Sequence, residues 1–134
     1  MGRARQTNKE GWVRTRGKPK GAAAVTVREV DMATVFDVNG QLTHQLGLKM
    51  RQAVEAGRRH LLVNLTNVTY IDSAGVGELI RVMTSLRSRG GQLKLCGLPE
   101  KVWRVLRAAN LDKVLEIHPD EAAALASFSE ASRA

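Results

Sequence analysis

Short β-branched segments alternate with amphipathic helical segments from residue 25 onward, and this alternation constrains the fold more than any other feature. The first two strands are predicted at 25–30 and 33–38, separated by Asp31-Met32, which is the spacing of a hairpin. The further elements are predicted at 60–65, 92–96 and 114–117 for strands and 43–56, 73–89, 99–109 and 119–128 for helices, with a loop at 66–72. Strands that alternate with helices pair in parallel. We therefore expect an α/β fold, a mixed sheet of four to five strands covered by about four helices.

The charge of the chain is concentrated at its beginning. Residues 1–24 contain seven Lys and Arg side chains and one acid, and so carry six of the eight net positive charges. This segment has few bulky apolar residues to bury, so we expect a disordered tail ahead of a domain at 25–134. Two interpretations of the tail stay open: a basic arm that contacts nucleic acid with Trp12 as a stacking group, or a solvated extension.

Several classes of protein are excluded by composition. The longest apolar runs are too short to span a bilayer, and no apolar stretch typical of a secretory signal precedes residues 22–24, so we expect no membrane partner. Cys96 is the only cysteine, which excludes an internal disulfide and a multi-cysteine zinc site. These features favour a reducing, cytoplasmic setting.

The richest functional signal lies where the third strand leads into the strongest helix. Asp72 or Ser73 is expected to cap that helix, and Ala74, Gly75 and Gly77 leave its first turn almost without side chains. A glycine inside a helix costs about 1 kcal/mol relative to alanine, which the close approach of another group would explain. A hydroxyl at the positive end of a helix, surrounded by small residues, suits a phosphate group. Ser73 is therefore a candidate site for a phosphate group, with plain capping of the helix as the alternative.

Residues 61–79 (LLVNLTNVTYIDSAGVGEL), 89–96 (RGGQLKLC) and the pairs Val105-Leu106 and Asn110-Leu111 together resemble a STAS domain of the bacterial anti-sigma factor antagonist kind. The resemblance covers about residues 25–128. It implies that Ser73 is phosphorylated by an anti-sigma factor that is itself a serine kinase of the ATPase type. It also implies partner switching in transcription control. The unmodified antagonist would bind the kinase and free a sigma factor, and a PP2C-type phosphatase would reverse the modification.

The physics of such a switch can be stated for this chain. A phosphate on Ser73 adds about −1.5 to −2 charge, which a helix N-terminus tolerates within the fold but a packed interface does not. The predicted partner surface consists of Asp72, Ser73, Ala74, Gly75, Val76, Gly77, Glu78 and Arg81, with Glu78 and Arg81 on the outer face of the helix. From the resemblance, Asp72 would also orient the hydroxyl or hold a metal bound with the kinase's nucleotide. The plainer interpretation is a helix cap and a solvated helix face.

Other chemistry has little support in the sequence. Ile71 stands where a hydrolase nucleophile motif requires glycine, and His44, His60 and His118 are scattered without the spacing of a metal site or a catalytic base. We therefore expect a binding module without catalysis, metal or cofactor. Thr43 follows Gly40-Gln41-Leu42 where many antagonists have a carboxylate. The alternative function is a constitutive scaffold subunit, as in stressosomes or lipid-transport complexes, in which Ser73 is never modified.

Overall fold

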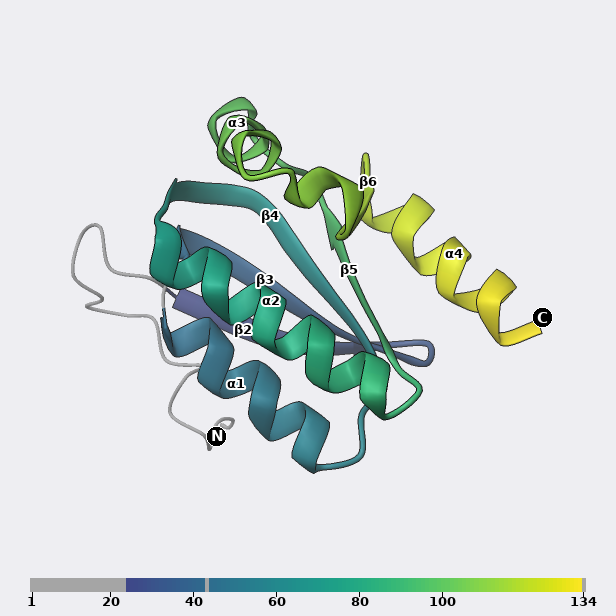
Figure 1. Cartoon of the computed structure of the whole chain (residues 1–134). Helices are drawn as coiled ribbons and strands as arrows, with labels where there is room; N and C mark the ends of the chain where they lie inside the picture. Colours follow the sequence, from purple (N-terminus) through teal and green to yellow (C-terminus); the bar gives the residue numbers. More distant parts are fainter. Residues whose placement is uncertain (1–23, 43, 134) are drawn as a thin grey trace, which may run out of the picture.

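The computed structural model describes residues 24–42 and 44–133. Residues 1–23, with Trp12 and all but one residue of the predicted tail, lie outside the described residues, as does Thr43. The elements are β2 (Ala24–Val30), β3 (Ala33–Leu42), α1 (His44–Glu55), β4 (His60–Ile71), α2 (Ser73–Ser88), β5 (Gln92–Cys96), α3 (Glu100–Ala108), the short 3₁₀ helix η1 (Leu111–Lys113), β6 (Glu116–His118) and α4 (Glu121–Arg133). They form the α/β architecture expected from the sequence (Figure 1).

One mixed sheet contains all five described strands in the order β2-β3-β4-β5-β6. The first two pair antiparallel around the predicted two-residue turn, with Val30 opposite Ala33. Asp31 adopts a φ of 54°, a left-handed conformation that aspartate accepts more readily than most residues. The remaining pairs are parallel, which confirms the predicted mixed sheet.

The predicted loop at 66–72 is wrong, because β4 continues to Ile71, which pairs with Leu42 at the end of β3. The register between the two strands shifts after Asp37 and again after Gly40, so that β4 contains extra residues relative to β3. Such bulges change which face of the sheet the following side chains occupy. The period-two pattern of buried residues in β4 ends at Leu65. Val68 and Ile71 do not continue this pattern, but they are buried because the bulges change the face on which they lie.

Smaller boundary differences occur toward the end of the chain. Pro99 is the N-cap of α3 and not its first residue, and β6 lies two residues later than predicted at its start. Helix α4 continues to Arg133, beyond the predicted end at 128. Val105 of α3 is exposed, whereas Val102 and Leu106 are buried.

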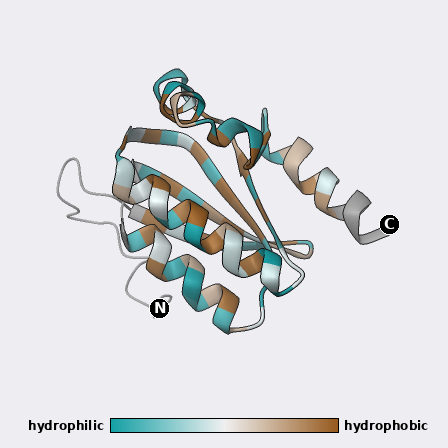
Figure 2. Ribbon diagram, in the orientation of Figure 1, coloured by the Kyte–Doolittle hydropathy of each residue, from teal (hydrophilic) through white to brown (hydrophobic). Residues whose placement is uncertain are grey.

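The sheet lies between helices, with an apolar cluster of side chains on each of its faces. Helices α1 and α2 lie side by side on one face, where Figure 1 shows them parallel to each other, and α4 packs on the opposite face. The main core contains β3, β4 and β5 side chains such as Phe36, Val63 and Leu95, whereas Ala124 and Phe128 of α4 cover a smaller cluster. In Figure 2 the apolar colour follows the strands, and the helices alternate polar and apolar residues as amphipathic helices do.

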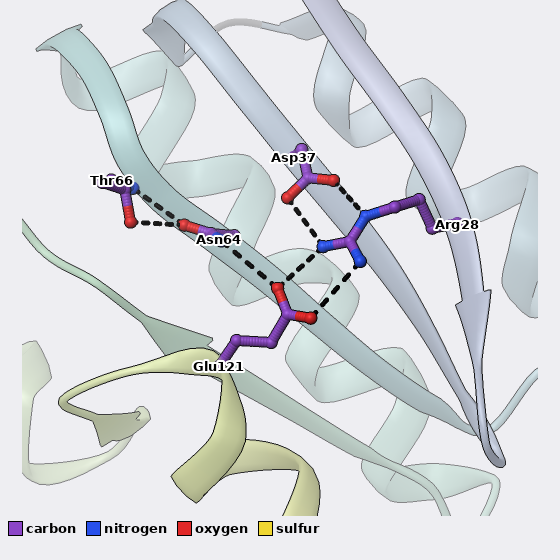
Figure 3. A network of polar contacts seen from close by, with 5 residues as sticks. All are labelled: Arg28, Asp37, Asn64, Thr66 and Glu121. Atoms are coloured by element: carbon purple, nitrogen blue, oxygen red, sulfur yellow. Dashed lines mark hydrogen bonds and ion pairs between the residues drawn. The ribbon is translucent and has the colours of Figure 1, made fainter.

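Polar contacts fix the beginning of α4 to the sheet, as Figure 3 shows. Arg28 of β2 bonds to Asp37 of β3 and, with an Nη2 to Oε1 distance of 2.7 Å, to Glu121 of α4. These bonds raise the pKa of Arg28 above its usual range and lower that of Glu121. Farther along α4, the Ser127 hydroxyl accepts a hydrogen bond from the buried Lys94 of β5 at 2.6 Å.

Among the described residues, none of the helices combines the length and apolar character that crossing a membrane requires.

Candidate functional site

The candidate phosphoacceptor lies between β4 and α2, at the carboxyl end of the central strand. Asp72 is extended, with φ −128° and ψ −177°, and Ser73 is the first residue of α2. The Asp72 Oδ1 atom accepts a hydrogen bond from the Gly75 backbone N–H at 3.0 Å, and the Asp72 carbonyl accepts from Val76 N–H at 3.0 Å. Asp72 is therefore the N-cap, which decides between the two candidates that the sequence left open.

Capping by Asp72 leaves the Ser73 side chain available. Ser73 is exposed, and in the described part of the chain its hydroxyl enters no hydrogen bond. Asp72 and Ala74 are exposed beside it, Gly75 is buried, and Val76 and Gly77 are partly buried. The structure thus brings together the aspartate, the serine and the small residues that the sequence singled out. What it shows is a free hydroxyl beside the first, unpaired amides of a helix.

Glu78 is the site residue that the sequence placed wrongly. It was expected on the outer face of α2, but only 6% of it is exposed and it faces α1. Its carboxylate bonds to Arg51 of α1 at 2.5 Å, and a Cβ atom on Gly47 of α1 would overlap it. Position 78 follows Gly75 by three residues and precedes Val82 by four, so it lies on the buried stripe of α2. That spacing was the signal that could have found it.

Arg81 lies on the outer face, as predicted. Its side chain is 63% exposed, and its Nη1 atom is 3.5 Å from the Glu78 carboxylate. The Nη2 atom is 4.0 Å from where a Cβ on Gly77 would lie, and among the described residues no other atom outside the chain neighbours of Gly77 and the nearby backbone of its own helix lies within 4 Å of that point. A Cβ at position 77 would therefore meet only the end of a flexible arginine, at ordinary van der Waals distance, and the space around Gly77 is open.

Two surface neighbours of this site were missed by sequence reasoning. Arg51 of α1 shares the Glu78 carboxylate with Arg81 and is 38% exposed. Tyr70, two residues before Asp72, is an exposed aromatic residue in β4. A tyrosine three residues before the candidate phosphoacceptor is the sequence signal that could have identified Tyr70, whereas nothing in the local sequence marks Arg51.

The remaining reactive side chains lie elsewhere. His118 contacts Glu116 at 2.9 Å and Ser127 at 3.3 Å, at the edge of the sheet under α4. Burial and the nearby Lys94 lower the pKa of His60. Burial raises the pKa of the Cys96 thiol to about 11, as expected of an apolar filler in the core. The described residues contain no group of three or more His, Cys, Asp or Glu side chains arranged to hold a metal ion.

Comparison with known proteins decides the family. The sequence profile of the STAS domain matches residues 24–124. The chain belongs to the STAS domain family. The anti-sigma-B factor antagonist of Listeria monocytogenes is 31% identical to this STAS domain in an alignment of 94 residues, and the alignment covers 67% of this chain and 82% of that protein.

Solved structures agree with the fold of this STAS domain. A Thermotoga maritima protein described as a candidate anti-sigma factor antagonist has a TM-score of 0.70 and 26% identity, over 77% of this chain and 92% of that one. The Bacillus cell fate determinant SpoIIAA, in its phosphorylated form, has a TM-score of 0.61 and 23% identity, over 75% of this chain and 96% of that one. The second likeness supports the fold alone.

Proposed function

We propose that this STAS domain is an anti-sigma factor antagonist, a regulatory binding module of the bacterial cytoplasm that acts without catalysis of its own. Its partner would be an anti-sigma factor that is also a serine kinase of the ATPase type. The observation that carries the proposal is the exposed Ser73 hydroxyl at the N-terminus of α2, left free because Asp72 already caps the helix. The anti-sigma-B factor antagonist of Listeria monocytogenes, as a relative, supports the same role.

Phosphorylation of Ser73 would switch this module off. The phosphate would lie beside the unpaired amides and positive dipole of α2, so the fold can accept it. At a docked interface the same group would have to be desolvated beside the exposed Asp72 carboxylate, which weakens binding. A PP2C-type phosphatase would restore the unmodified form.

The docking surface would consist of the exposed and partly buried residues around Ser73. These are Asp72, Ala74, Val76 and Gly77 from the start of α2, together with Arg81 two turns into the helix. Glu78 is left out as a direct contact because it lies between the two helices. Gly75, also buried, would act by keeping the first turn free of side chains.

Two substitutions at Ser73 test the proposal against the anti-sigma kinase encoded by the same genome. Ser73→Ala removes the acceptor and should bind the kinase permanently. Ser73→Asp should stay folded and bind at least about tenfold more weakly, since a carboxylate carries part of the phosphate charge. Ser88→Asp is the matched control, because Ser88 is an exposed serine at the other end of the same helix.

Isothermal titration calorimetry and circular dichroism give the two readouts. If both Ser73 variants bind as tightly as the wild-type chain, the switch is wrong and a constitutive scaffold subunit becomes the better account. If the wild-type chain itself binds no anti-sigma kinase, the antagonist role is wrong.

A further inference from the structure

The contact between α1 and α2 contains a buried carboxylate that bonds to two surface arginines. The Glu78 side chain is 8% exposed, whereas Arg51 and Arg81 are 38% and 63% exposed. Each arginine has five N–H donors in a planar fork, and among the described residues it contacts Glu78 through one nitrogen, Nη1. The anchored ends therefore face the helices, and the free donors of both guanidinium groups face solvent.

A glycine on α1 gives the Glu78 side chain room for this arrangement. A Cβ on Gly47 would overlap the Glu78 carboxylate in the conformation in which it reaches Arg51 across the helix contact. Arg81 lies back over Gly77, one turn from Ser73. Four residues of helix rise about 6 Å, so the exposed donors of Arg81 lie well within the footprint of one partner docked on Ser73, about 800 Å² on each side.

The charge of this cluster specifies the kind of group that it can receive. In the part of the chain that the structure describes, the buried Glu78 carboxylate faces two guanidinium groups, and these positive groups lie outermost. Holding two guanidinium groups in place reduces the entropy lost when they bind. Forked N–H donors match the two oxygens of a carboxylate, which is the anionic group that an unmodified protein surface carries.

We propose that Arg51 and Arg81, positioned by Glu78, form a receptor for an acidic side chain of the anti-sigma kinase. This inference rests on the function proposed above and extends the docking surface from α2 across to α1. Glu78 is a positioning residue in this arrangement and does not touch the partner. The receptor contributes to affinity in the unmodified state, independently of the charge on Ser73.

Glutamine substitutions test the inference by titration of the same anti-sigma kinase. Arg81→Gln and Arg51→Gln keep a hydrogen-bond donor for Glu78 but remove the positive charge. Each should lower the affinity about tenfold, and the double variant should lower it further and flatten the dependence of affinity on salt concentration. Arg81→Gln is the safer variant because its side chain is mostly exposed.

Arg89→Gln is the matched control. Arg89 is also 3.5 Å from a carboxylate, that of Glu55, but it lies at the far end of α2. The Arg89→Gln variant should bind the kinase with an affinity within twofold of that of the wild-type chain. Glu78→Gln should weaken binding without removing either arginine, a result that a direct role of the arginines alone would not give.

The outcomes separate this inference from the proposed function. If the wild-type chain binds the kinase, Ser73→Asp releases it, and the double arginine variant still binds within twofold of wild type, the receptor is wrong while the antagonist role holds. If the wild-type chain binds no kinase, both are wrong. Circular dichroism of each variant confirms that a loss of affinity does not come from unfolding.

Discussion

The buried carboxylate between α1 and α2 makes an asymmetric prediction about stability. We compare Arg51→Met with Glu78→Met, which remove opposite partners of the same ion pair while keeping side-chain volume close to the original. In the first variant the 8% exposed Glu78 carboxylate keeps the mostly exposed Arg81 at 3.5 Å but loses its shorter ion pair. In the second, an apolar side chain occupies the buried position and both arginines turn to water.

The exposed fractions set the two magnitudes. A buried charge that loses a main partner costs about 2–3 kcal/mol, because it cannot recover its hydration. Arginines that are 38% and 63% exposed recover much of theirs, and a buried methionine gains hydrophobic burial in return. We therefore expect Arg51→Met to lower the free energy of unfolding by about 2 kcal/mol and Glu78→Met to change it by less than about 1 kcal/mol.

Urea unfolding followed by circular dichroism measures both values, with equal m-values showing that the unfolded states are alike. The double variant should be close to Glu78→Met, since removing the carboxylate removes the cost of leaving it poorly paired. Equal losses for the two single variants, or a larger loss for Glu78→Met, would refute the reasoning.

Three further predictions concern the rest of the domain. Gly97 has a φ of +70° and a Cβ there would overlap the Thr66 hydroxyl, so Gly97→Ala should cost at least about 2 kcal/mol in thermal unfolding. Gly57→Ala, at φ +99° with open space around it, should cost only about 1 kcal/mol. The pKa of Glu121 is lowered by the guanidinium beside it in Figure 3, so its stabilising effect is present above the ordinary carboxyl pKa of about 4.3 and is lost as the pH falls below it. Glu121→Gln should therefore flatten the loss of stability between pH 6 and pH 3. Burial raises the pKa of Cys96 to about 11, so at pH 8 the folded chain should react with a disulfide reagent at least about 100-fold more slowly than the urea-unfolded chain.

The type and order of the elements could be predicted from the sequence because they depend on local periodicity. The second half of β4 could not, because two register shifts change the face on which its side chains lie. Those shifts depend on the length of β3, a partner more than twenty residues away. A period-two pattern that is interrupted in this way looks like a loop when only the sequence is read.

The candidate site likewise has one part that could be predicted from the sequence and one part that could not. The exposed Ser73 and the cap at Asp72 follow from local chemistry at the start of one helix, and both were anticipated as alternatives. The burial of Glu78 depends on Gly47 and Arg51, which approach it only when α1 and α2 pack together. The charge of Glu78 predicted an exposed position. Glu78 is nevertheless buried, because it lies on the buried stripe of α2 and an arginine on the neighbouring helix bonds to its carboxylate.

The account depends on a hydroxyl that can be modified without disturbing the fold, and a chain with phosphoserine at position 73 tests this most directly. The phosphorylated and unmodified chains are compared by thermal unfolding and by calorimetric titration with the anti-sigma kinase. We expect melting temperatures that agree within about 2 °C and an affinity at least about 100-fold lower for the phosphorylated chain. A phosphorylated chain that unfolds, or that binds the kinase as tightly as before, would contradict the account.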